Sequence, residues 1–196
     1  MKSLIDKLIW KPFSEIDIAD TFFDSLRVDY GDQKFNNWFL GKVKNGERAL
    51  TLIENGKVYA FLYLKPENEA IELVERTLPA KPRLKIGTLK LDDSISQHRL
   101  GEGIIGVALW KWQESKRETI YVTVFEKHEK LIGLLLKFGF EKAGTKENGE
   151  IVLARSRKRI DYTNAYSSFP FVSPHTTKGG IIPINDSFHD RLFPYS

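Results

Sequence analysis

The chain has 196 residues, of which 41% are hydrophobic, 12% aromatic and 29% charged, so it can bury the core of one ordinary domain with a modest extension. It contains no cysteine, which excludes disulfides, thiolate metal sites and a cysteine nucleophile, and its four histidines lack close ligand spacing, so no metal is predicted. The net charge of +4 comes from basic residues interspersed with acidic ones, which favours a solvated surface over a nucleic-acid-binding stripe.

No apolar run approaches the roughly 18 residues that a membrane-spanning helix needs. Residues 1–13 lack the continuous apolar stretch and the small-residue cleavage site of a secretory signal. We therefore expect a soluble, cytoplasmic protein with no membrane partner.

The first 44 residues predict two helices. Ser14 can cap a helix whose apolar positions over 16–26 follow a helical stripe, and Gly31 closes that region. A second short helix is predicted over 33–44.

Strands follow these helices. The segments 48–53 and 58–64 are rich in apolar and aromatic residues and flank Asn55-Gly56, the preferred centre of a tight hairpin turn. Asn148-Gly149 marks a second hairpin. Early antiparallel strands followed by strand-helix units predict an α+β fold with a mixed, mostly antiparallel sheet flanked by helices. The order predicted from residue 84 onward is strand 84–91, helix 101–114, strand 120–125, helix 128–138, strand 140–144 and strand 150–154.

The composition changes after residue 155. Residues 1–155 are predicted to form one domain, and 156–196 form an irregular tail with four prolines and aromatic residues that follow no period. Segments such as 169–171 and 181–184 are too apolar for a solvated linker, so part of the tail is expected to pack on the domain or to lead to a further module after residue 196. The dense basic run 155–159 is interpreted as an exit from the last strand, with an anion or RNA contact as the alternative.

The strand 84–91 contains an irregularity in its alternation. Its apolar residues fall on even positions up to Ile86 and on odd positions from Leu89, with Gly87 at the slip. A one-residue slip at a glycine is typical of a β-bulge, which bends a strand away from its neighbour. The alternative is a strand buried on both faces, which needs no strict alternation.

The segment after that strand predicts an anion site. Gln97-His-Arg-Leu-Gly-Glu-Gly103 runs directly into a helix, and its small residues let an anionic group approach the backbone. The free N–H groups and the positive end of the helix dipole then face that group, which favours a pyrophosphate.

The order of these parts resembles the GCN5-related N-acetyltransferase (GNAT) superfamily, in particular one prokaryotic branch of it. The likeness covers roughly residues 22–155 and implies the acyl-CoA N-acyltransferase fold. It also implies that acetyl-CoA is the donor substrate and that the acceptor is a primary amine. The parts that carry the resemblance are the bulged strand, a Gln/Arg-x-x-Gly-x-Gly/Ala turn that opens a helix, the strand 121–125, the closing Phe138-Gly139-Phe140, and the early stretches 22–26, 38–39 and 61–64.

By resemblance, acetyl-CoA binds backbone groups of the bulged strand and of the turn. If Gly101 and Gly103 fill the two small positions of the motif, its first position is His98. If Gly101 is the second small position, Arg99 replaces the first glycine and Ser96 stands first. The predicted acetyl-CoA contacts are Leu89, Leu91, Gln97, His98, Arg99, Leu100, Gly101, Glu102, Gly103 and Ile104.

The catalytic residues are less regular. Many family members place a tyrosine four residues before the glycine of the closing Gly-Phe pair, where it protonates the CoA thiolate, whereas this chain has Leu135 there. By resemblance, Glu72 or Glu126 takes the ammonium proton through water, and His128 or Tyr121 supplies one to the thiolate. The alternatives are a helix-cap or surface role for His128 and a solvated charge for Glu72.

Two rival functions remain open. One is an acyl-CoA-binding or regulatory module that keeps the architecture and has lost catalysis, and the other is an RNA-binding domain that uses the run 155–159 with aromatic residues of the tail. The acceptor also stays open between a protein terminus, a lysine, a small amine and a charged tRNA.

Overall fold

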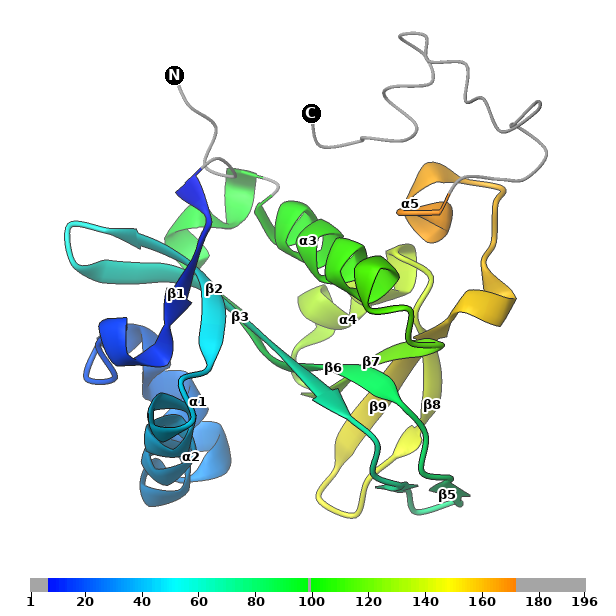
Figure 1. Ribbon diagram of the computed structural model, residues 1–196, viewed down its shortest axis with the longest axis horizontal. Helices are drawn as coiled ribbons and strands as arrows, with labels where there is room; N and C mark the ends of the chain where they lie inside the picture. The colour runs from blue at the N-terminus through cyan, green and yellow to red at the C-terminus, as the bar shows by residue number, and fades with distance from the viewer. Residues whose placement is uncertain (1–6, 99, 172–196) are drawn as a thin grey trace, which may run out of the picture. The chain divides into compact units, whose positions relative to one another are not determined.

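The computed structural model describes residues 7–98 and 100–171 (Figure 1). These residues form two compact units. Unit 1 consists of the described residues of 1–63 and 88–100, and unit 2 of those of 64–87 and 101–196. Hydrogen-bonded strands follow the order β1-β2-β3-β6-β7-β9-β8, in which β6 and β7 are parallel and the other recorded pairs are antiparallel. The predicted mixed, mostly antiparallel sheet with flanking helices is confirmed.

The elements alternate as the hydrophobic pattern predicts, with several short additions. The early elements are β1 (Ile9–Pro12), η2 (Phe13–Glu15), η3 (Thr21–Phe23), α1 (Asp24–Tyr30), α2 (Asp32–Lys44), β2 (Arg48–Glu54) and β3 (Lys57–Glu67). The middle elements are β4 (Ile71–Glu72), β5 (Thr77–Leu78), β6 (Arg83–Leu91), η4 (Asp93–His98), α3 (Leu100–Ser115) and β7 (Thr119–Phe125). The last elements are α4 (Glu129–Lys137), β8 (Glu141–Thr145), β9 (Glu150–Ser156), η5 (Arg157–Arg159) and α5 (Ala165–Ser168).

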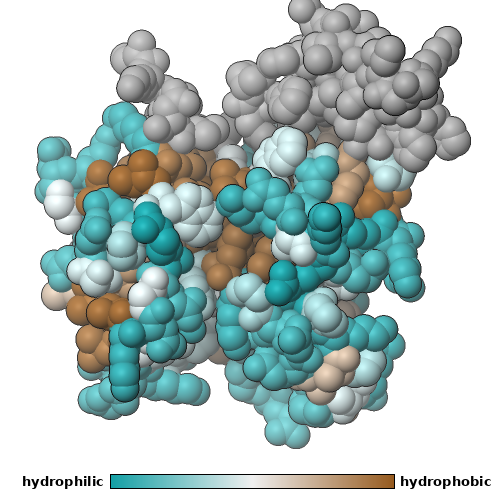
Figure 2. Space-filling view, viewed as in Figure 1, coloured by the Kyte–Doolittle hydropathy of each residue, from teal (hydrophilic) through white to brown (hydrophobic). Residues whose placement is uncertain are grey.

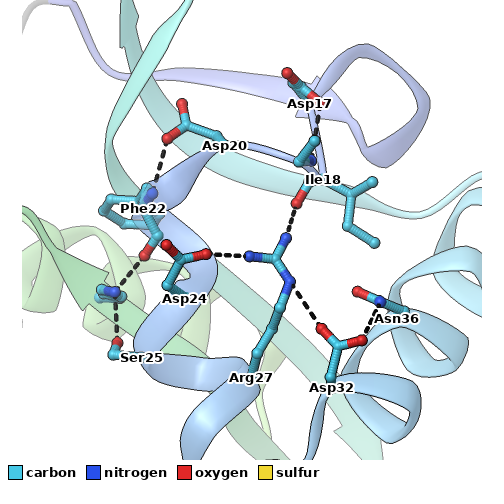
Figure 3. A network of polar contacts seen from close by, with 11 residues as sticks. Asp17, Ile18, Asp20, Phe22, Asp24, Ser25, Arg27, Asp32 and Asn36 are labelled. Carbon is cyan, nitrogen blue, oxygen red and sulfur yellow. Dashed lines mark hydrogen bonds and ion pairs between the residues drawn. The ribbon is translucent and has the colours of Figure 1, made fainter.

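The first predicted helix is wrong at its start. Ser14 lies inside η2, and Asp20 caps the following helical turn, because its Oδ1 accepts a hydrogen bond of 2.8 Å from the backbone N–H of Phe22 (Figure 3). The other oxygen of Asp20 accepts a bond of 2.7 Å from the N–H of Val58. A carboxylate that satisfies two backbone donors therefore fixes the start of the helix. Gly31 ends α1 with φ of 86°, as predicted.

Arg27 holds the start of α1 to α2. Its guanidinium donates to the carbonyl of Ile18, pairs with Asp24 at 2.5 Å and lies 3.5 Å from Asp32 at the start of α2 (Figure 3). Lys90 of β6 donates to the carbonyl of Phe22 and to the Ser25 hydroxyl. These contacts connect α1 to α2 and to β6.

The core of unit 1 is aromatic. Phe13 lies at its centre, with its ring edge-on to the rings of Phe39 at 4.9 Å, Tyr63 at 5.3 Å and Phe61 at 5.5 Å. Such edge-to-face pairs add to the free energy of burial. The buried members of this core are Phe13, Ile16, Phe22, Phe23, Phe35, Phe39, Ala49, Val58, Phe61 and Tyr63.

Both predicted hairpins are confirmed. In the first, Asn55 and Gly56 have φ of 51° and 80°, the left-handed pair that a tight turn between β2 and β3 needs. In the second, Gly149 has φ of 85° between the antiparallel strands β8 and β9. β1, a four-residue strand that pairs with β2, is not among the predicted elements.

The strands of unit 2 have two different faces. Ile120, Val122 and Val124 alternate with Tyr121 along β7, so they point to the opposite face, over which Figure 1 draws α3 and α4. Tyr121 packs with Ile71, Leu73 and Val152 on the face of the β4-β5 hairpin. Each face is thus buried by a different part of the chain.

Gly144 lets the β4-β5 turn lie against β8. The carbonyl of Thr145 accepts a hydrogen bond of 2.8 Å from the backbone N–H of Val74. The carboxylate of Glu75 accepts hydrogen bonds from the backbone N–H of Glu75 and from that of Thr145, and these bonds hold the pKa of Glu75 below its usual value. A Cβ on Gly144 would lie 2.6 Å from Cδ1 of Leu73, a buried core residue.

Gly144→Ala is therefore expected to lower the free energy of unfolding by about 1.5 kcal/mol through overpacking. Urea denaturation measures this loss. Gly133→Ala serves as control, since nothing lies within 4 Å of the Cβ it would add in α4. Equal stability of the two variants would show that the turn moves away at no cost.

Hydrophilic side chains cover most of the face that Figure 2 shows, with separate apolar patches between them. Among the described residues, the most exposed large apolar side chains are Val28 at 82%, Val74 at 67% and Leu40 at 56%. They belong to three different elements, α1, the β4-β5 turn and α2. None of the helices within 7–98 and 100–171 is both long and apolar enough to cross a membrane.

Candidate functional site

The parallel ladder of β6 and β7 ends before the strands do. Its register runs from Arg83↔Thr119 to Ile86↔Val122, although β7 continues to Phe125. On its other edge β7 stays paired with β9 as far as Phe125. Within the described chain, one edge of 123–125 therefore carries backbone groups outside any recorded ladder. The end of the ladder lies directly before Gly87, where the sequence predicts a bulge.

The helix that connects these two strands begins with small residues. α3 opens at Leu100, which is fully buried, continues through the half-buried Gly101 and the buried Gly103, and anchors Ile104 in the core. The N–H groups of a first helical turn have no partner within the helix, and the dipole of a 16-residue helix adds positive potential there. This end of α3 suits an anion.

Three of the predicted contacts fall outside what the structure describes. Arg99 is outside the described residues, and for Gln97 and His98 only the backbone, in η4, is described. The two registers of the glycine motif are therefore both still predictions. Leu89 and Leu91 are half-buried residues of β6 in unit 1, and their contacts with pantetheine also remain predictions.

A cation lies at the start of α3. Lys137, in the last turn of α4, forms an ion pair of 2.8 Å with Glu102 in the first turn of α3. Its Nζ lies 3.6 Å from the centroid of the Tyr166 ring of α5. The hydrogen bond to Glu102 raises the pKa of Lys137, with smaller contributions from Tyr166. The second carboxylate oxygen of Glu102 is buried with no hydrogen-bond partner in the described part of the chain.

This pair is not apparent from the sequence, because Glu102 and Lys137 are 35 residues apart and neither stands out in its own helix. Their pairing neutralises the carboxylate that would otherwise oppose an anion at the helix start. It also places the ammonium group of Lys137 where a phosphate oxygen can replace the Glu102 carboxylate as its partner.

The four predicted catalytic residues all lie in unit 2, but they belong to different elements. Tyr121 is 2% exposed on β7 and pairs in register with Lys85. His128 is exposed at the start of α4, and its backbone N–H donates to the carbonyl of Phe125 at 3.0 Å. Tyr121 and His128 thus flank the open edge of β7.

The two carboxylates differ from each other. Glu126 is exposed in the turn after β7, close in sequence to the open edge. Glu72 lies on β4, where its carboxylate accepts a hydrogen bond from the Thr77 hydroxyl of β5. That bond gives Glu72 a structural role within its hairpin.

No family model matches the sequence, and no curated protein sequence is significantly similar to it. Solved structures match it well in fold: AtaTR bound with AcCoA has a TM-score of 0.54 at 17% identity and covers 78% of this chain and 95% of that chain. For Ard1 from Thermoplasma volcanium the TM-score is 0.53 at 11% identity, and the match covers 76% of this chain and 97% of that chain. For an N-acetyltransferase from Staphylococcus aureus Mu50 the TM-score is 0.50 at 15% identity, and the match covers 75% of this chain and 94% of that chain.

The chain has the GNAT fold. In these terms, β6 and β7 are the parallel strands of the fold and α3 is the helix that connects them.

Leu135 distinguishes this GNAT fold from the pattern that the sequence resembles. The residue is fully buried in α4, where it supplies an apolar side chain to the core. A tyrosine at 135 would have to fit this packed position.

The basic run 155–159 is largely used inside the fold. Arg155 is 3% exposed and donates to the carbonyls of Phe169, at 2.6 Å, and Ser167. Arg157 donates to the carbonyls of Trp112, Gln113 and Arg117 and so covers the end of α3. Lys158 and Arg159 are exposed, so the run does not present a continuous basic surface.

The first part of the predicted tail packs in unit 2. The Phe169 ring lies edge-on to Trp110 at 5.8 Å, and the Phe171 ring edge-on to Trp112 at 5.3 Å. The segment 181–184 and the rest of the predicted tail after 171 lie outside the described residues. A search of the described residues for three or more His, Asp or Glu side chains that could hold a metal found no such group.

Proposed function

We propose that this chain is an N-acetyltransferase that transfers the acetyl group of acetyl-CoA to a primary amine. The observation that carries the proposal is the β6-β7 ladder that ends at Ile86↔Val122, on the two strands that α3 connects. An open strand edge offers backbone donors and acceptors to an amide-rich arm such as pantetheine. The presence of AcCoA in the AtaTR structure supports the same donor here.

The nucleotide half of acetyl-CoA is assigned to the start of α3. The N–H groups from Gly101 to Ile104 and the helix dipole favour its pyrophosphate. Lys137 offsets the negative charge of Glu102 at the same end of the helix, so that this carboxylate does not oppose the phosphates. Backbone N–H groups suit a phosphate, because the small glycine residues let its oxygens approach the backbone and no catalytic side chain is required.

The reaction is a direct attack of a neutral amine on the thioester carbonyl. The new C–N bond forms, the C–S bond breaks, and the proton lost by the amine balances the proton gained by the CoA thiolate. Positioning supplies most of the rate enhancement in such a reaction. His128 or Tyr121 is proposed to protonate the thiolate, and Glu126 or Glu72 to accept the ammonium proton through water.

Two conservative variants distinguish the proposed acids. His128→Asn keeps a good residue for the start of α4 and removes the titratable ring, and Tyr121→Phe keeps the ring in the core and removes the hydroxyl. The variant that lacks the true acid is expected to lose about 100-fold in kcat with an unchanged Kd for acetyl-CoA. Unchanged kcat in both variants would rule out both residues.

The activity itself is tested by following the release of the CoA thiol in the presence of amines. The panel contains an N-terminal peptide, a lysine peptide, a small diamine and an aminoacyl-tRNA, which represent the acceptor classes left open by the sequence. Amine-dependent release with one class is the expected result. Release that never depends on the amine would contradict acetyl transfer.

Leu135 favours a second candidate, an acyl-CoA-binding module without catalysis. This module would bind acetyl-CoA as tightly as an enzyme does but would release no thiol with any amine. Binding and release measured on the same preparation separate the two functions.

A further inference from the structure

Lys85 is an unusual lysine. It lies on β6 opposite Tyr121, and its Nζ stands 5.4 Å from the centroid of the Tyr121 ring. The side chain is only partly accessible, and it forms neither a hydrogen bond nor an ion pair with any residue in 7–98 and 100–171. A partly buried ammonium loses hydration, and this loss is costly without such a partner.

The carboxylates near Lys85 are engaged elsewhere. Glu150, with a side chain 6% exposed, accepts hydrogen bonds from Thr123 at 3.1 Å and Asn148 at 2.9 Å and lies 3.6 Å from Lys146. Glu67, with a side chain 8% exposed, pairs with Lys65 at 3.1 Å. Their charges act on Lys85 without contact, and those of Lys146 and Lys65 oppose them.

Burial dominates the balance of these influences. It lowers the pKa of Lys85, while the charges of Glu67 and Glu150 partly restore it. A larger fraction of Lys85 is therefore the neutral amine at any given pH than of an exposed lysine. The neutral amine is the form that attacks a thioester.

The position of Lys85 places this amine next to the open edge of β7. Lys85↔Tyr121 is the pair directly before Ile86↔Val122, where the ladder ends. A strand advances about 3.3 Å per residue, and the four-carbon stem of a lysine spans a comparable or greater distance. Glu150, whose charge acts on Lys85, pairs with Phe125 at the far end of that open edge.

We propose that Lys85 is an acetylation site of this chain and that acetyl-CoA bound to the chain is the donor, an inference that rests on the proposed function. The neutral Nζ attacks the thioester carbonyl, a C–N bond forms and the C–S bond breaks. One proton leaves the nitrogen and one is taken up by the thiolate, so acetyl-lysine and CoA thiol are the products. The product amide carries no charge, which removes the cost of burying an ammonium group.

The test incubates the full chain with acetyl-CoA and measures acetylation of each lysine by mass spectrometry of its peptides. Lys111 is the matched control, because it lies on α3 with a side chain 45% exposed and pairs with Glu114. We expect Lys85 to be acetylated at least tenfold faster than Lys111. An excess of CoA without the acetyl group is expected to suppress the reaction at Lys85 but not at Lys111.

Calorimetry on the same sample shows whether acetyl-CoA binds. Binding without preferential, CoA-suppressible acetylation of Lys85 would overturn this inference and leave the proposed function intact. Absence of binding would overturn both. The variant Lys85→Arg confirms the assignment of the peptide signal, since it is expected to lose the acetyl mass at position 85 and to leave labelling of Lys111 unchanged.

Discussion

Arg155→Leu is expected to lower the free energy of unfolding by about 3 kcal/mol. The guanidinium of Arg155 is buried and satisfies the carbonyls of Ser167 and Phe169, and it stacks at 5.5 Å over the Trp112 ring. Leucine fills part of the volume but leaves both carbonyls without this donor. Urea denaturation measures the loss.

The same basic run supplies the control. Arg159 is 75% exposed and reaches Glu141 at 3.3 Å, so Arg159→Leu is expected to change stability little. If Arg155→Leu were as stable as this control, the segment around α5 would not be an integral part of unit 2. A loss of stability in Arg155→Leu but not in Arg159→Leu would place the end of the folded domain beyond residue 155, the boundary that the composition predicts.

Gly101→Asp is expected to weaken acetyl-CoA binding by about 100-fold, or roughly 3 kcal/mol. An aspartate in the first turn of α3 competes for the N–H groups that are assigned to the pyrophosphate and adds a negative charge beside it. The same charge interacts favourably with the helix dipole, so the free energy of unfolding is expected to stay constant or rise. Loss of affinity without loss of stability is therefore specific to an anion site.

Gly133→Asp in α4 is the matched control for this variant. It adds the same charge to a helix of the same unit at an exposed position with open space around it. It is expected to leave the acetyl-CoA Kd unchanged. Equal Kd values for the two variants would remove the start of α3 from the binding site.

Local signals in the sequence predicted much of this fold. The Asn-Gly turns fixed two hairpins, and the 3.6-residue pattern located α3 and α4 within two residues of their ends. Short elements were missed, because a two-residue strand such as β4 leaves no periodic pattern. The capping role of Asp20 is not apparent from the local sequence, because its second bond, from the N–H of Val58, spans 38 residues.

The candidate site was predictable only where it depends on the backbone. The glycine turn and the end of the β6-β7 ladder follow from residues close together in the chain. The Glu102-Lys137 pair, the partial burial of Lys85 and the hydrogen bonds of Arg155 all depend on contacts between distant segments. A basic run or a single lysine therefore looks the same in sequence whether it is buried or solvated.

Titration of the full chain with acetyl-CoA by isothermal calorimetry tests whether this GNAT fold binds the proposed donor. We expect saturable one-to-one binding in the micromolar range, competed by CoA and weakened in Gly101→Asp. No heat of binding at millimolar acetyl-CoA, from a preparation shown to be folded by its cooperative urea transition, would contradict it.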